Sequence, residues 1–296
     1  MPELPDITIY QEALADRLTG QPLLGMKMLN PFVLRSVEPK PSDFVNRVVQ
    51  GVSRVGKRLV LEFDGDRFVV VHLMIAGRLR WLEPGKSVPG KISHAAFSFP
   101  NGTLVLTEAS SKKRASITLG QGREFLASID PGGIDPLTMS RSQFQDVLLR
   151  ENRTLKRALT NPHFFSGIGN AYSDEILHAA RLSPLRLTQA LKPEELYRLY
   201  AAIPSTLTHW TEVLRKQFAG KFPGAGDITA FRPDFAVHGK FKQPCPVCGA
   251  PVQRIAYAEN EANYCAVCQN EGRLLADRAL SRLLKDDWPR TLEGWD

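Results

Sequence analysis

Residues 245–268 read CPVCGAPVQRIAYAENEANYCAVC and hold all four cysteines of the chain. Two C-x2-C pairs with sixteen residues between them can bring four thiolates to one tetrahedral centre, the geometry of a closed structural zinc site. Two disulfide bonds are the alternative, but they are typical of exported proteins, and the acidic, proline-rich N-terminus is unlike a signal peptide. The pattern predicts one structural Zn²⁺ ion, bound by Cys245, Cys248, Cys265 and Cys268.

The charge balance favours a polyanionic partner. The 296-residue chain carries 38 Lys and Arg against 31 Asp and Glu, a formal net charge of +7, which suits nucleic acid. No apolar run reaches the roughly 18 residues needed to cross a bilayer. We expect a monomeric cytoplasmic protein of the bacterial, nucleoid-associated type, with no membrane partner.

The N-terminal part of the chain is expected to be a helix followed by an antiparallel β domain. The apolar spacing of residues 6–19 predicts an amphipathic helix. Asn101-Gly102 suits a tight hairpin because both residues tolerate positive φ. Four short apolar or alternating runs predict strands at 58–63, 67–74, 95–99 and 103–109.

Turn-forming residues at 130–136 mark a boundary, beyond which helical spacing dominates. Ser140 can cap a helix, and Pro204 should kink or split another, because it removes a backbone donor. A short amphipathic helix is expected from Leu275 to Leu284. The other helices are predicted at 152–160, 171–181 and 193–217, and the domains at 1–130, 137–232, 233–270 and 271–296.

Three separated features now coincide: Pro2-Glu3-Leu4-Pro5, the run Gly167-Ile168-Gly169-Asn170, and the C-terminal finger. In these three features together, the chain resembles the formamidopyrimidine-DNA glycosylase and endonuclease VIII family. The resemblance implies an α+β multidomain fold, with an N-terminal helix and antiparallel β-sandwich, a helix-two-turns-helix domain and a four-cysteine zinc finger. It also implies damaged DNA as the partner, with base excision followed by strand cleavage through elimination.

The resemblance assigns the chemistry to the N-terminus. Once Met1 is removed, Pro2 would be the nucleophile that attacks the sugar and forms an imine. Glu3 would be the acid that protonates the sugar or the departing base, and Lys57 would contact phosphate and assist β-elimination. Asp6 stands where the family usually has Glu.

The same resemblance implies DNA contacts elsewhere in the chain. They are expected at His94, Lys113, Lys156, Gly169, Asn170 and Asn260. Glycines in the turn before a helix let the backbone approach a phosphate, which the helix N-terminus then attracts. Within the helix that follows, Glu175 is expected to support the motif internally.

Three further departures from the family pattern affect this assignment. Asn260 occupies the tip of the finger, where the family has an Arg that assists the second, δ elimination. Asn cannot supply that charge, so δ-elimination is expected to be weak or to use another group. Family members fill the gap left by a flipped base with a Met, an Arg and often a Phe. Here Ile75 stands at the usual Met position and the Phe is missing, so Met74 or Ile75 would fill the gap together with Lys113 or Arg114.

The segment at 224–232 is followed quickly by the finger, so the loop that caps oxidised purines in some members is expected to be short. This feature favours oxidised pyrimidines, ring-opened purines or lesions in unusual DNA. A catalytically weak binder of damaged DNA on the same fold is the main alternative. A general zinc-ribbon protein would explain the finger and the charge, but it leaves the N-terminus and the run at 167–170 unexplained.

Overall fold

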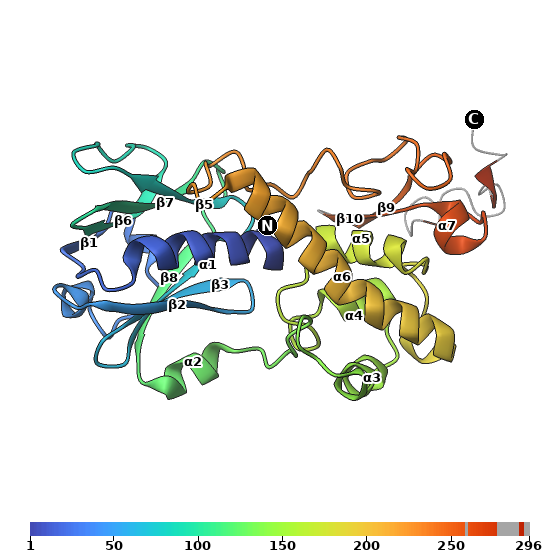
Figure 1. Ribbon diagram of the computed structural model, residues 1–296, viewed down its shortest axis with the longest axis horizontal. Coiled ribbons are helices and arrows are strands. Elements are labelled where there is room, and N and C mark those ends of the chain that lie inside the picture. The colour runs from blue at the N-terminus through green and yellow to red at the C-terminus, as the bar shows by residue number, and fades with distance from the viewer. Residues whose placement is uncertain (258–259, 277–289, 293–296) are drawn as a thin grey trace. The chain divides into compact units, whose positions relative to one another are not determined.

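The computed structural model describes residues 1–257, 260–276 and 290–292 (Figure 1). The chain divides into two compact units, neither of them one continuous segment. Unit 1 is Met1–Pro131 with Trp210–Ala230, and unit 2 is Gly132–His209 with Phe231–Asp296. The first division falls inside the turn-rich stretch at 130–136, and residues 210–230 pack with the β-rich unit although their sequence groups them with the helices.

Unit 1 is a β-sandwich. Residues 25–121, all of them described, form two four-stranded sheets with the orders β1-β6-β7-β5 and β2-β3-β4-β8, and every pairing in them is antiparallel. The strands are β1 (Gly25–Met28), β2 (Val49–Val55), β3 (Arg58–Phe63), β4 (Arg67–His72), β5 (Gly77–Leu82), β6 (Ser93–Phe99), β7 (Gly102–Glu108) and β8 (Ser116–Gln121). Short 3-10 turns lie at Pro31–Val33 and Pro41–Phe44.

The two central strands of the second sheet, β3 and β4, are buried on both faces, which explains their nearly continuous apolar runs. Along β3, Leu59 and Leu61 face the central core, whereas Val60 belongs to a separate cluster on the opposite face. That outer face is covered by helix α2 (Arg123–Ile129). Gly120 allows the approach, because a Cβ there would lie 2.1 Å from the ring of Phe125.

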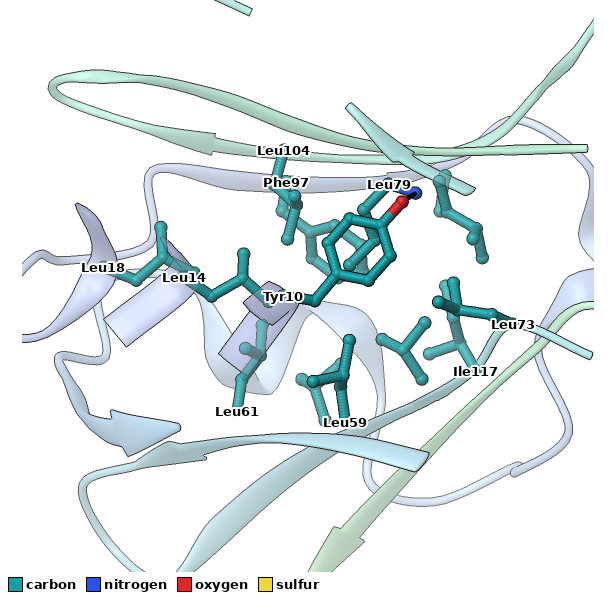
Figure 2. Packing of buried hydrophobic residues seen from close by; sticks show 14 of the residues in the cluster. Tyr10, Leu14, Leu18, Leu59, Leu61, Leu73, Leu79, Phe97, Leu104 and Ile117 are labelled. Atoms are coloured by element: carbon teal, nitrogen blue, oxygen red, sulfur yellow. Dashed lines mark hydrogen bonds between the residues drawn. The ribbon is translucent and has the colours of Figure 1, made fainter. Parts of the chain in front are cut away.

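The central core of unit 1 lies between its sheets and is filled from one side by helix α1 (Leu4–Leu18). Figure 2 shows Tyr10, Leu14 and Leu18 of α1 among leucines, Phe97 and Ile117 from both sheets. Ile7, Tyr10, Leu14 and Leu18 are all fully buried, as their helical spacing predicts. The phenol oxygen of Tyr10 accepts a hydrogen bond from the Leu79 N–H at 3.4 Å.

The helices of unit 2 begin with α3 (Arg141–Leu149), whose predicted cap is confirmed: Ser140 Oγ accepts a hydrogen bond from the Gln143 N–H. Helix α4 (Leu155–Thr160) starts three residues later than predicted. Helix α5 (Asn170–Ala179) and helix α6 (Pro193–Phe218) follow, with a 3-10 turn at Thr188–Ala190 between them.

Three expectations about these elements were wrong. Of the kink or split expected at Pro204, the split is wrong, because α6 is one continuous helix through this residue, with Ile203 and Leu207 buried around it. The strand expected at 67–74 ends at His72, because Met74 takes a positive φ of 53° that no strand accommodates. Helix α2 lies at the end of the segment 1–130, where only a β domain was expected to follow the N-terminal helix.

The finger combines a hairpin of β9 (Gln253–Tyr257) and β10 (Asn260–Tyr264) with helix α7 (Ala266–Asn270). Of the predicted C-terminal helix, Leu275 is described and has no regular structure, whereas residues 277–284 lie outside the described residues. Among the helices that the structure describes, none has the length and apolar character needed to span a membrane.

Candidate functional site

The N-terminal amine lies in a buried, charged environment. Pro2 is buried and Glu3 is only 3% exposed. Burial is the main cause that lowers the pKa of the Met1 amine; the positive charges of Arg78 and Lys57 lower it further, and Glu3 and Asp6 oppose them. Two of the residues predicted to be catalytic therefore act electrostatically on this amine, as does Arg78, which the sequence did not suggest.

Asp6 fixes the backbone at the start of α1. Its Oδ2 accepts a hydrogen bond from the Glu3 N–H at 2.9 Å, and its side chain is buried. Glu3 is the N-cap residue of this helix and Pro5 lies in its first turn. The shorter carboxylate is thus long enough to close the cap and hold Glu3 beside the N-terminus.

His72 is a site residue that sequence analysis missed. It pairs with Arg58 across β3 and β4, so the hairpin brings it next to the positive charges of Arg58 and Lys57. Burial, followed by these two charges, lowers the pKa of His72 to about 4. The signal was the strand register, since counting inward from Asp64–Asp66 places residues 58 and 72 opposite each other.

The turn after β4 carries two of the predicted void-filling residues, Met74 and Ile75. Met74 has a φ of 53°, and the Gly77 N–H closes the turn on the Leu73 carbonyl oxygen at 2.8 Å. Arg78 Nη1 donates to the carbonyl oxygens of Ile75 and Gly77. The left-handed residue turns Ile75 outward, where its side chain is 56% exposed, whereas Met74 is only partly exposed.

His94 lines a pocket of about 440 Å³ together with Lys91 and Lys113. The imidazole is 4% exposed, its Nδ1 lies 2.9 Å from Asn30 Nδ2 and its Nε2 lies 3.8 Å from Glu108 Oε2. Burial lowers the pKa of His94, against the effect of Glu108. The ring therefore forms the floor of this pocket rather than an exposed contact.

Glu108, which the sequence did not single out, holds the loop with the other predicted contacts. Its buried carboxylate accepts hydrogen bonds from the N–H groups of Arg114 and Ala115, and Lys113 Nζ donates to its carbonyl oxygen at 2.6 Å. The side chains of Lys113 and Arg114 are exposed. A carboxylate fully used by backbone donors fixes the course of this loop.

The glycine-rich run in unit 2 forms a turn that leads into α5, as predicted. Gly167 has a φ of 85°, and Gly169 is the N-cap residue before Asn170. The side-chain amide of Asn170 donates to the carbonyl oxygen of Glu261 in β10 at 2.9 Å. Asn170 thus ties the start of this helix to the finger hairpin.

Lys156 lies in a buried ionic network rather than on an exposed face. It is 8% exposed, and its ammonium donates to Asp174 Oδ1 at 2.5 Å and to the carbonyl oxygen of Asn170 at 2.6 Å. Asp174 Oδ2 lies 2.7 Å from His238 Nδ1. Two of the three N–H groups of this ammonium therefore bond inside the protein, and the expected phosphate contact stays a prediction.

Glu175 has the internal role expected of it. Its carboxylate accepts hydrogen bonds from three consecutive N–H groups, those of Ala236, Val237 and His238, at 2.7 to 2.9 Å. Burial raises the pKa of Glu175, and these bonds oppose the rise. The segment that leads into the finger is therefore fastened to α5.

The four cysteine sulfurs lie within 4.8 Å of one another. The Sγ atoms of Cys245 and Cys268 are 3.9 Å apart, and those of Cys248 and Cys265 are 3.4 Å apart. Tetrahedral zinc with Zn–S bonds of about 2.3 Å needs sulfurs about 3.8 Å apart. The donor set therefore fits Zn²⁺.

Asn260 is the first residue of β10 and pairs with Tyr257. The two residues between them, Ala258 and Glu259, lie outside the described residues. The backbone of Asn260 thus lies directly beside the predicted hairpin tip.

Comparison with known proteins gives three family matches that follow one another along the chain. Residues 1–113 match the formamidopyrimidine-DNA glycosylase N-terminal domain. Residues 133–217 match the formamidopyrimidine-DNA glycosylase H2TH domain, and residues 242–270 match a zinc finger found in FPG and IleRS.

Relatives and solved structures agree with these matches. A formamidopyrimidine-DNA glycosylase from Pelotomaculum thermopropionicum is 30% identical over 276 residues, covering 91% of this chain and 99% of the relative. One from Wolbachia of Brugia malayi is 29% identical over 273 residues, covering 91% and 100%. The Lactococcus lactis protein bound to abasic-site DNA shares the fold, with a TM-score of 0.79 at 24% identity over 90% of this chain and 99% of that one.

Proposed function

The chain belongs to the formamidopyrimidine-DNA glycosylase family of DNA repair glycosylases, and we propose that it excises a damaged base through the amine of Pro2 and then cleaves the strand by β-elimination. One observation carries the proposal: Pro2 is buried, and the Met1 amine directly before it is acted on by Glu3, Lys57 and Arg78, so an amine at this end of the chain meets the same charges once Met1 is removed. An amine whose pKa is lowered is unprotonated, and so nucleophilic, in a larger fraction of molecules at neutral pH.

Removal of Met1 would leave the secondary amine of Pro2 at this place. Its lone pair attacks C1′ of the damaged nucleoside, and the bond from C1′ to the base breaks with its electron pair leaving on the base, which takes up a proton. The nitrogen, which carries a proton after the attack, gives it up, and its recovered electron pair forms the second bond to C1′ as the bond from C1′ to the ring oxygen breaks. Glu3 supplies the proton to that oxygen, and an iminium ion joins Pro2 to C1′.

Strand cleavage follows from this iminium ion. A proton leaves C2′, the bond from C3′ to its phosphate oxygen breaks, and the phosphate departs with the electron pair. Water then hydrolyses the iminium ion and frees Pro2. Lys57 and His72 lie together at the end of the β3–β4 hairpin, and we propose that the compact charge of Lys57 holds the phosphate next to the lesion.

DNA would be held largely through phosphates. Gly169 and Asn170 open α5, whose N-terminal end attracts an anion, and Lys113 lies exposed on its loop. Such contacts set register but read no sequence, as suits an enzyme that searches for damage. The damaged base must leave the stack, and the exposed Ile75 favours this residue over Met74 as the group that fills the gap, with Arg114 beside it.

The finger supports binding through its fold. The four cysteines would hold one Zn²⁺ ion, which when bound supplies a cross-link between the two ends of the finger. We further propose that residues 1–130 carry out the chemistry and that residues 137–232 and 233–270 bind DNA, with 271–296 as a C-terminal tail. The protein is proposed to work as a cytoplasmic monomer on the nucleoid.

Borohydride trapping on abasic-site DNA tests the nucleophile. The matched pair is the protein with a cleavable N-terminal extension, assayed before and after a protease exposes Pro2. A covalent adduct should form only after cleavage, because an extension turns the amine into an unreactive amide. Failure of the cleaved protein to form an adduct would overturn the proposal and favour a DNA-binding protein without turnover.

Glu3→Gln should separate the two stages of the reaction. Loss of a general acid slows base excision by about 10²- to 10⁴-fold, whereas trapping on DNA that already lacks the base should persist. Single-turnover excision of an oxidised pyrimidine measures the first stage. Asp16→Asn, an exposed change on the same helix, is the control that should leave both stages unchanged.

A further inference from the structure

His178 is a buried polar side chain that the proposed reaction does not use. It lies in the last turn of α5 and is 7% exposed. Its Nε2 lies 3.3 Å from the Sγ atom of Cys245, one of the four sulfurs of the proposed zinc site, and this contact is itself buried. Both residues belong to unit 2, so the contact lies within one compact unit.

The contact is part of a polar face that α5 turns towards the finger. Asp174 and Glu175 precede His178 by four and three residues, so the three side chains share one face of the helix, and all of them are buried. Asp174 and Glu175 contact residues 236–238, and His178 contacts Cys245 farther along the same segment. The row of polar contacts therefore extends along α5 as far as the zinc site.

The chemistry of the two groups sets the direction of the bond. A cysteine that binds zinc is a thiolate, which has no proton and can only accept a hydrogen bond. The imidazole is therefore the donor, through an N–H at Nε2, and a donor to an ionised acceptor makes a charge-assisted bond. Cys245 is only 2% exposed, so water has little access to take the place of this donor.

His178 acts on a zinc ligand rather than on the ion. Among the described residues, the donor atoms that gather within 4.8 Å of one another are the four sulfurs, without His178. The sulfur of Cys265 has a backbone donor inside the finger, the N–H of Cys268 at 3.4 Å. Cys245 instead receives its donor from a helix outside the finger. Four thiolates around one Zn²⁺ ion leave two negative charges, which such donors partly offset.

We propose that His178 is a positioning residue of the zinc centre: its imidazole N–H bonds the Cys245 thiolate, orients this ligand and strengthens the binding of the ion. The inference rests on the zinc ion of the proposed function and adds to the centre a residue from outside the finger. It also attaches the first cysteine pair to the helix whose other end, at Gly169 and Asn170, opens the proposed phosphate site.

Cobalt-substituted protein tests the hydrogen bond, because Co²⁺ bound to thiolates has a sulfur-to-metal charge-transfer band that responds to donors at the sulfur. His178→Phe removes the N–H and keeps a flat ring of similar size, so the band should move to longer wavelength. His178→Gln, whose amide N–H reaches nearly as far as Nε2, should keep the wild-type band. His163→Phe, the same replacement at an exposed histidine of unit 2, is the matched control.

Competition with a chelator measures the affinity for Zn²⁺ itself. Loss of a contact to a metal ligand typically weakens metal binding by about 10- to 100-fold, and His178→Phe should show this loss, whereas His178→Gln and His163→Phe should match the wild type. Wild-type band and affinity in His178→Phe would overturn the role. Equal changes in the Phe and Gln variants would overturn it as well, because packing rather than the N–H would then explain them.

These measurements are separable from the test of the proposed reaction. A wild-type protein that binds neither Co²⁺ nor Zn²⁺ would overturn the zinc site and this inference together. Neither measurement involves DNA, so failure of the Pro2 reaction in borohydride trapping leaves both readouts unchanged.

Discussion

Asp6 and Arg78 show how single residues tune the N-terminus. Asp6 closes the helix cap at Glu3. Arg78 donates hydrogen bonds to the carbonyl oxygens of Ile75 and Gly77 in the turn after β4, and its charge lowers the pKa of the Met1 amine. The start Pro2-Glu3 could be read from the sequence, because its residues are adjacent. His72 needs the register of the β3–β4 hairpin as well, and Arg78 could not be read at all, because its strand pairs with the distant β7.

His72 gives a pH prediction. Its pKa is lowered from 6.5 to about 4 by burial and by Arg58 and Lys57, so between these values the unfolded chain binds a proton that the folded chain does not. The contribution of His72 to the free energy of unfolding is complete above pH 6.5 and falls as the pH drops towards 4, by at most about 1.4 kcal/mol per pH unit.

Urea unfolding of the wild type and of His72→Gln at pH 7.5 and pH 5 measures this effect. The wild type should lose more stability between the two pH values than the variant does. His94 and His178 also have lowered pKa values, but they are common to both proteins and cancel in the difference. Equal losses would contradict the assignment to His72.

At the scale of elements, α4, α5 and the segment entering the finger are joined through Asp174. Asp174→Asn leaves the Lys156 ammonium buried without its counter-ion, which typically costs about 3–5 kcal/mol. Hydrogen exchange in peptides from 155–179 should therefore become at least about 100-fold faster. Asp146→Asn, on the exposed face of α3, is the control and should change hydrogen exchange in these peptides little. Similar exchange in the two variants would show that the network around Asp174 does not stabilise these helices.

Elements with strong local signals were predictable, and those fixed by distant contacts were not. The Ser140 cap and the buried face of α1 are local properties of the sequence. Helix α2 depends on the outer face of the sheet and on the space at Gly120. Pro204 stays within α6 because the buried residues around it hold both halves in place. Lys156 is buried because its ammonium pairs with Asp174. The two residues lie 18 positions apart in the sequence, so no local pattern predicts this pair.

At the scale of the whole molecule, the finger is joined to the helices by more than the chain. Asn170 binds the Glu261 carbonyl oxygen, Gln269 Nε2 donates to the Leu182 carbonyl oxygen, and His178 Nε2 lies 3.3 Å from Cys245 Sγ. Loss of zinc should therefore loosen the start of α5 as well as the finger.

Treatment with a chelator should abolish affinity for abasic-site DNA and raise hydrogen exchange in 167–182, and added Zn²⁺ should reverse both effects. Peptides from β3 and β4 in unit 1 provide the internal control, because no cysteine lies there. Retention of full affinity by zinc-free protein would contradict a structural role for the finger in binding.

The return of residues 210–230 to unit 1 has a consequence for synthesis on the ribosome. Leu214, Phe218 and Ile228 belong to the same core as α1, and Phe222 packs against Tyr10 and Trp81. The sandwich therefore cannot complete its core when residue 131 emerges, and about a hundred more residues must be translated first. Until then a nascent chain exposes these apolar faces, a natural binding site for a chaperone, and the helices of residues 132–209 have the opportunity to form in the interval.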